Sequence, residues 1–96
     1  MVSAVVLDAN GLMMPFQFSV NLDRELKRLF GDLPVLVPSS VLGELANSDD
    51  PAGKGALALA RKYPVVETPL RGDDAVLEVA RRTSAAVVTN DRGLIR

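Results

Sequence analysis

Residues 4–8, AVVLD, are the stretch from which the fold of this chain can be worked out. Residues 4–7 form a short apolar run rich in β-branched side chains, and Asp8 ends the run. A continuous apolar run of this length is typical of a strand that is buried on both faces, as in a parallel sheet. Similar runs occur at residues 35–37, 65–66 and 85–88. The sequence therefore predicts a parallel four-stranded sheet.

The segments between these runs have the residue spacing of helices. Leucine and phenylalanine recur at helical spacing between Asn21 and Gly31, which predicts a helix with an asparagine cap and a glycine stop. Further helices are expected at residues 41–45 (capped by Ser39 or Ser40), at 56–63 and from 72 onward. Strands that alternate with helices indicate a three-layer α/β/α domain, which we expect to span residues 1–96.

Three connecting segments carry residues that interrupt regular structure. Asn10-Gly11 is predicted to turn the chain, and residues 12–18 to form a loop or a short helix interrupted by Pro15. Residues 47–53 (NSDDPAG) are predicted to form a turn.

Composition narrows the possible chemistry. The 96 residues suffice for one small domain, and 48% hydrophobic content with a net charge of −1 argues against disorder. There is no cysteine and no histidine, which excludes disulfides, thiolate metal sites and histidine-based catalysis. The N-terminus has no basic region, and its apolar run is too short for a signal peptide or a membrane span. We therefore expect a cytoplasmic protein whose chemistry comes from carboxylates, lysine, hydroxyls or the backbone.

Acidic residues fall where a parallel sheet places its ligands. Asp8 follows the first strand, Glu44 lies in the helix after the second, Asp73 and Asp74 begin the helix before the fourth, and Asp91 follows the fourth. Ligands of open α/β sheets bind outside the carboxyl ends of the strands. Each position also has a purely structural interpretation, as a strand end, a solvated glutamate or a helix cap. The joint placement is what indicates a site.

Carboxylates gathered at one place repel one another unless a cation lies between them. An all-oxygen cluster selects hard ions such as Mg²⁺ or Mn²⁺, which activate water and neutralise a leaving oxygen in phosphodiester chemistry. When one of Asp73 and Asp74 is counted, four of the 12 acids belong to this cluster. The 11 Lys and Arg therefore outnumber the remaining acids. A mildly basic surface around an acidic centre favours a nucleic-acid substrate.

Four motifs with these acids resemble the PIN-domain family, especially its short archaeal type, which is similar to rRNA-processing and toxin PIN ribonucleases. The motifs are VLDAN at residues 6–10, PSSVLGEL at 38–45, GDDAVL at 72–77 and VVTND at 87–91. The resemblance implies a sheet with a central first strand and a pocket that binds one or two Mg²⁺ or Mn²⁺ ions. It also implies endonucleolytic hydrolysis of single-stranded RNA, in RNA processing or as a toxin.

The resemblance assigns roles to particular residues. The catalytic and metal-binding carboxylates would be Asp8, Glu44, Asp74 and Asp91, with Asp74 preferred to Asp73 because it directly precedes the Ala-Val-Leu run. Supporting polar residues would be Asn10, Thr89 and Asp73, and phosphate contacts are expected from Lys54 and Arg92. The implied partners are RNA, an antitoxin or an RNA-processing protein, and a second copy in a homodimer, with no role for a membrane.

The sequence departs from the family pattern after its fourth motif. PIN domains usually continue with another helix and an edge strand, whereas only residues 92–96 follow Asp91 here. We therefore expect a PIN-like sheet that lacks the last helix and edge strand. Its fourth strand would then be an unpaired edge, which favours dimerisation or reduces stability.

Two alternatives to a ribonuclease stay open. The first is a catalytically weak PIN scaffold that binds RNA or protein without cleaving, and loss of metal binding would favour it. The second is a receiver-like signalling domain, which needs an aspartate after the third strand. The sequence there reads Glu67-Thr68-Pro69, so this alternative ranks last.

Overall fold

A computed structural model describes residues 1–89, and its strands lie where the apolar runs predict them. The elements in chain order are β1 (Ala4–Leu7), α1 (Ala9–Phe18), α2 (Leu22–Phe30), β2 (Val35–Pro38), α3 (Ser39–Ala46), α4 (Ala52–Ala60), β3 (Val65–Val66), α5 (Gly72–Thr83) and β4 (Ala85–Val88).

The sheet is parallel and its strand order is β3-β2-β1-β4. β1 is central, with Val5 paired to Val35 on one side and to Ala86 on the other. All four residues of β1 are buried, which explains why this strand contains no polar side chain. The predictions of a parallel four-stranded sheet and of a central first strand are thus confirmed.

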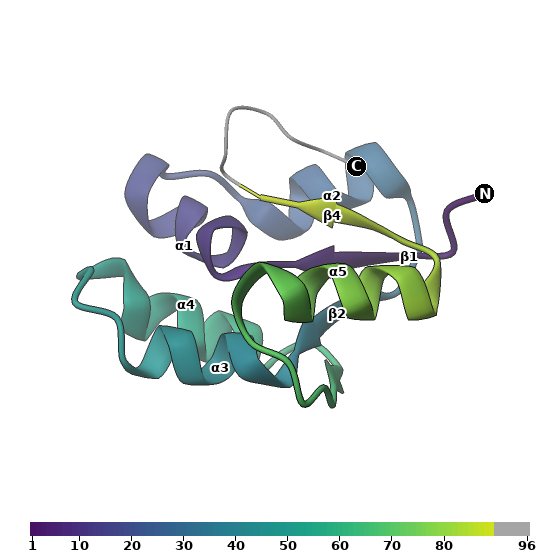
Figure 1. The fold of residues 1–96 in the computed structure, drawn as a ribbon. Coiled ribbons are helices and arrows are strands. Elements are labelled where there is room, and N and C mark those ends of the chain that lie inside the picture. The colour runs from purple at the N-terminus through teal and green to yellow at the C-terminus, as the bar shows by residue number, and fades with distance from the viewer. Residues whose placement is uncertain (90–96) are drawn as a thin grey trace.

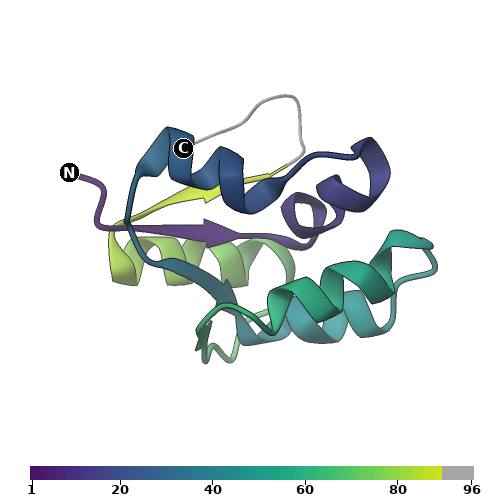
Figure 2. The same ribbon diagram turned by 180° about the vertical axis from the view of Figure 1, so that it is seen from behind.

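Helices cover both faces of the sheet. In Figure 1 α5 lies in front of the strands, and in the opposite view of Figure 2 α2 lies in front of them. α5 connects β3 at one edge with β4 at the other, so it crosses and contacts β2, β1 and β4. α1, α3 and α4 pack against one another, and α1 begins directly after β1. The predicted three-layer α/β/α architecture is confirmed.

The core is aliphatic, as the scarcity of aromatic residues predicts. Its largest fully buried side chains include Leu7, Leu12, Val37, Val41 and Val79. Burying one side chain of this size contributes about 1.5–3 kcal/mol. No polar or charged residue within positions 1–89 is buried. The acidic side chains therefore lie where water, and an ion in water, can reach them.

The predicted turn at Asn10-Gly11 is wrong, because both residues belong to the first turn of α1. Asp8 has extended backbone angles, and its carboxylate accepts a hydrogen bond from the backbone N–H of Gly11 at 2.7 Å. This is an N-cap, so the helix begins immediately after the strand. α1 continues through Pro15, whose missing N–H removes one helical hydrogen bond.

The helices before and after β2 show how local signals compete. α2 has the predicted Asn21 cap, which accepts from the N–H of Arg24 at 3.1 Å, and it ends at Gly31 with φ +65°. α3 instead begins at Ser39 with Pro38 as its N-cap, so the predicted serine cap is wrong. α4 begins at Ala52, inside the predicted turn of residues 47–53. None of the helices within residues 1–89 has the length and apolar character needed to span a membrane.

Candidate functional site

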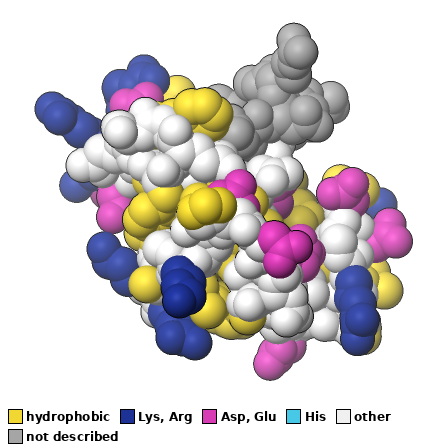
Figure 3. Space-filling view, turned by 90° about the vertical axis from the view of Figure 1, so that its left-hand side faces the viewer, with side chains coloured by type: hydrophobic (Ala, Val, Ile, Leu, Met, Phe, Trp, Pro, Cys, Tyr) yellow, Lys and Arg dark blue, Asp and Glu magenta, His cyan; other side chains and the backbone are white. Residues whose placement is uncertain are grey.

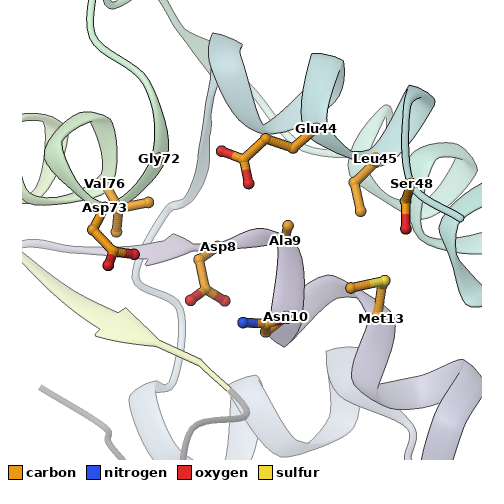
Figure 4. A pocket seen from close by; sticks show the side chains of 10 residues that line it. All are labelled: Asp8, Ala9, Asn10, Met13, Glu44, Leu45, Ser48, Gly72, Asp73 and Val76. Atoms are coloured by element: carbon orange, nitrogen blue, oxygen red, sulfur yellow. The ribbon is translucent and has the colours of Figure 1, made fainter. Parts of the chain in front are cut away.

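A pocket of about 220 Å³ opens beyond the carboxyl end of β1. Figure 3 looks toward this end of the molecule, where Asp and Glu side chains lie near the middle and also at the margins, with several Lys and Arg side chains around them. The polar side chains that line the pocket are Asp8, Asn10, Glu44, Ser48 and Asp73. In Figure 4 the carboxylates of Glu44 and Asp73 extend toward Asp8 from two helices, and the carboxylate of Asp8 points toward Asn10.

Asp8 is held in place by two hydrogen bonds. One comes from the N–H of Gly11 and the other from the side chain of Thr89, which follows β4. Burial raises the pKa of Asp8 above its usual value; the hydrogen bonds to Thr89 and Gly11 counteract this rise, and the charge of Asp73 adds to it. The ionised carboxylate is thus both partly desolvated and near another negative charge. A cation in the pocket would offset both the desolvation of the carboxylate and its repulsion by Asp73.

Glu44 approaches the same space from α3. Burial raises the pKa of Glu44, a hydrogen bond from the backbone N–H of Gly72 opposes the rise, and the charges of Asp8 and Asp73 add to it. Gly72 has φ +59°, a conformation that favours glycine, and it begins α5. The turn at Gly72 therefore links the glutamate on α3 to the start of the helix that carries Asp73.

The third carboxylate in the pocket is Asp73 and not Asp74. Asp73 lines the pocket, and its charge raises the pKa of both other carboxylates. Asp74 lines neither of the two pockets that Asp8 lines. One residue along a helix turns the side chain by about 100°. Asp73 lines the pocket together with Val76, which is buried on the same face of α5. We therefore revise the preference for Asp74 to Asp73 on geometric grounds.

The remaining predicted residues differ in their placement. Asn10 lines the pocket, and in Figure 4 its amide lies beside Asp8. Thr89 contacts Asp8 and lines a second groove along α5 and β4, which Asp8, Asn10 and Asp73 also border. Lys54 lines a third pocket, which shares Leu45 and Ser48 with the acidic one but none of its carboxylates. Asp91 and Arg92 lie outside the described residues.

The sequence predictions missed two glycines on which the site depends. A Cβ atom on Gly11 would lie 2.6 Å from the carbonyl oxygen of Val88 and 3.2 Å from Oδ1 of Asp8. Only a glycine allows the first turn of α1 to lie this close to the end of β4. Its position three residues after Asp8 is the spacing of an N-cap contact, and that signal was available in the sequence. Gly72 had a weaker signal, as a glycine directly before two acids at a helix start.

The donor set of the pocket fits a hard divalent cation. Its polar lining within residues 1–89 consists of carboxylates with neighbouring amide and hydroxyl groups, and the only sulfur among these lining residues is the thioether of Met13. Among residues 1–89 no three carboxylates are close enough together to surround an ion. Mg²⁺ commonly keeps several waters and binds through one or two carboxylates, so the described acids match such a site.

Comparisons with known proteins agree with this fold. A family model described as "PIN like domain" matches residues 5–96. Ribonuclease VapC9 of Archaeoglobus fulgidus is 30% identical over 102 aligned positions, which cover 99% of this chain and 75% of the relative. The solved structure of the PIN domain endonuclease Utp24 matches with a TM-score of 0.77 and 21% identity, covering 95% of this chain and 73% of that one.

Proposed function

This chain belongs to the PIN-like domain family, and from that premise we propose that it is a metal-dependent endoribonuclease that hydrolyses single-stranded RNA. One observation carries the proposal. Asp8 directly after β1, Glu44 in α3 and Asp73 in α5 line one pocket, at the edge of the sheet where α/β proteins bind ligands. The family member VapC9 is named a ribonuclease, which agrees with this activity.

One or two of Asp8, Glu44 and Asp73 would bind Mg²⁺ or Mn²⁺ directly and the others through the waters of the ion, with Asp91 as a fourth carboxylate of the site. The ion would supply Lewis-acid activation of a water molecule and neutralise charge on the phosphate. Thr89 and the Gly11 N–H keep the Asp8 carboxylate directed into the pocket. Asn10 offers an amide beside it, which can orient a water or a phosphate oxygen. Hydrolysis adds water across a P–O bond and leaves two RNA ends, so no other co-reactant is required.

The electrostatics of the pocket favour a substrate that arrives with a cation. Three carboxylates repel a phosphate in the absence of metal. The Lys and Arg side chains on this face favour a polyanion that extends beyond the pocket, and we propose that Lys54 and Arg92 contact its phosphates. We further propose a cytoplasmic protein that acts on RNA, pairs with an antitoxin or an RNA-processing protein, and forms a homodimer.

A second candidate function is a PIN scaffold that binds RNA or protein without cleaving. The spacing of the carboxylates favours this candidate, because no three acids within residues 1–89 form a tight ligand cluster. In that case the pocket would bind an ion weakly, and Asp8 would serve mainly as the cap of α1.

Calorimetric titration with Mn²⁺, followed by incubation with an end-labelled unstructured RNA, tests the proposal. The variants are Asp8→Asn, which removes one charge from the pocket, and Asp32→Asn, which removes an exposed charge before β2, at the opposite end of the strands. Wild type and Asp32→Asn are expected to bind Mn²⁺ and to cleave internally, whereas Asp8→Asn is expected to do neither while it stays folded.

Each other outcome has a definite meaning. Binding of Mn²⁺ without cleavage by wild type would favour the scaffold. A folded wild type that binds no Mn²⁺ would overturn the metal-dependent mechanism. Equal cleavage by Asp8→Asn and wild type would show that the reaction takes place elsewhere.

A further inference from the structure

The segment that carries Asp73 to the pocket has no hydrophobic anchor. After β3, an edge strand of two residues, the next buried side chain is Ala75. Residues 67–74 are exposed except for Thr68, which is partly buried. Packing therefore does not fix where this segment lies, although its position decides how far Asp73 is from Glu44.

Polar contacts hold the segment instead. The hydroxyl of Ser39 accepts a hydrogen bond from the N–H of Thr68 at 3.1 Å and donates one to the carbonyl of Thr68 at 3.4 Å. The hydroxyl of Thr68 in turn accepts from the N–H of Leu70 at 3.2 Å, which closes a local turn. The guanidinium of Arg82 donates to the carbonyl of Glu67 at 2.8 Å.

The Ser39 contact connects directly to the acidic pocket. Ser39 is the first residue of α3, and Glu44 lies five residues later on the same helix. Thr68 likewise lies five residues before Asp73. The segment thus meets α3 at two points, Ser39 with Thr68 and Glu44 with Gly72. Since α3 is a rigid helix, these two points define the position of the Asp73 carboxylate relative to Glu44.

We propose that Ser39 is a positioning residue of the metal site, which sets the placement of Asp73 relative to Glu44 by holding Thr68 against the start of α3. The inference rests on the proposed function for its metal, and the contact itself can be tested without one. Groups that orient metal ligands from outside the coordination sphere typically change affinity by about 10- to 100-fold when they are lost.

The neighbouring residue provides a matched control. Ser40 is also a serine in the first turn of α3, but its buried hydroxyl has no hydrogen-bond partner within the described part of the chain. Ser39→Ala and Ser40→Ala therefore remove the same atom from adjacent positions, and only the first loses hydrogen bonds. Ser39→Thr and Ser39→Val form a second pair of equal shape, in which only threonine keeps the hydroxyl.

Two measurements on each folded variant test the proposal. One is Mn²⁺ affinity by calorimetry, and the other is hydrogen exchange of the Gly72 amide in the metal-free protein, which reports its bond to Glu44. Ser39→Ala and Ser39→Val are expected to weaken Mn²⁺ binding about tenfold or more and to speed Gly72 exchange. Ser40→Ala and Ser39→Thr are expected to stay within about twofold of wild type.

A purely structural serine would lower the melting temperature and leave Mn²⁺ affinity and Gly72 exchange unchanged. That result, or equal behaviour of the threonine and valine variants, would overturn the proposal. If the wild type binds no Mn²⁺, the proposed function fails, and Gly72 exchange alone decides on Ser39. Faster exchange in Ser39→Ala but not in Ser40→Ala would support the positioning role, and equal exchange would refute it.

Discussion

Replacing Asp8 by alanine and by asparagine separates two roles that its carboxylate combines. The first role is the N-cap of α1, through the 2.7 Å hydrogen bond from Gly11. Alanine loses this bond, at a cost of about 1 kcal/mol. In a domain of this size that cost lowers the melting temperature by about 4–8 °C. Asparagine caps helices as well as aspartate does, so Asp8→Asn keeps this contribution.

The second role is the negative charge, and its effect on stability depends on pH. Burial raises the pKa of Asp8 in the folded protein, and the charge of Asp73 adds to the rise. A raised folded pKa means that ionisation favours the unfolded chain. Any stability that Asp8 contributes is therefore fully present below its unfolded pKa, about 3.9, and is lost as pH rises through the folded pKa. In EDTA, the stability of Asp8→Asn relative to wild type should increase from pH 4 to pH 7.

Thermal unfolding of wild type, Asp8→Asn and Asp8→Ala in EDTA and in Mn²⁺ measures both roles. Ligand at a hundred times its dissociation constant stabilises a fold by about 2.7 kcal/mol. Wild type should gain such a shift from Mn²⁺, and both variants should lose most of it. The reasoning is refuted if Asp8→Asn melts as low as Asp8→Ala in EDTA, or if Asp8→Asn keeps the full Mn²⁺ shift.

Two further predictions use matched pairs of variants. Asp73→Asn is expected to weaken Mn²⁺ binding at least about tenfold, whereas Asp74→Asn should stay within about twofold of wild type; the reverse result in calorimetry would restore Asp74 as the third carboxylate. Gly11→Ala forces a Cβ to within 2.6 Å of the Val88 carbonyl oxygen and should destabilise the fold by about 1–3 kcal/mol. A Cβ on Gly43 meets no atom within 4 Å, so Gly43→Ala should stabilise α3 by about 0.5–1 kcal/mol. Denaturant unfolding measures both variants, and equal changes in the free energy of unfolding for Gly11→Ala and Gly43→Ala would contradict this account.

The sheet could be predicted from the sequence because its signal is strong and local. Each strand is an apolar run, and the buried β1 contains no polar residue that would interrupt its run. The helix from Leu22 was equally clear, because its cap, its apolar spacing and its glycine stop agree with one another. The convergence of Asp8 and Glu44 followed from the parallel sheet, since carboxyl ends of parallel strands share one edge.

Features that depend on tertiary contact were harder to predict. Asn10, Gly11 and Pro15 are typical of turns, and only the capping of Asp8 by the Gly11 N–H and the packing of α1 make this segment helical. The choice between Asp73 and Asp74 depends on the rotation of α5 against the sheet. Val76 and Leu77 are both apolar in the sequence, so only the structure shows which side of α5 is buried, and the motif resemblance pointed to the neighbouring residue.

The order of the strands also governs when the site forms during synthesis. β1 is made first and lies at the centre of the sheet, yet Ala4 pairs with Ala85, 81 positions further along the chain. Pairing over such a distance makes folding slow, because a long loop must close before any contact compensates for it. Asp8 gains its Thr89 contact only when the end of β4 has left the ribosome. A growing chain therefore carries Asp8, Glu44 and Asp73 without an assembled site until β4 has been made, and any activity of the pocket begins only once β4 has joined the sheet.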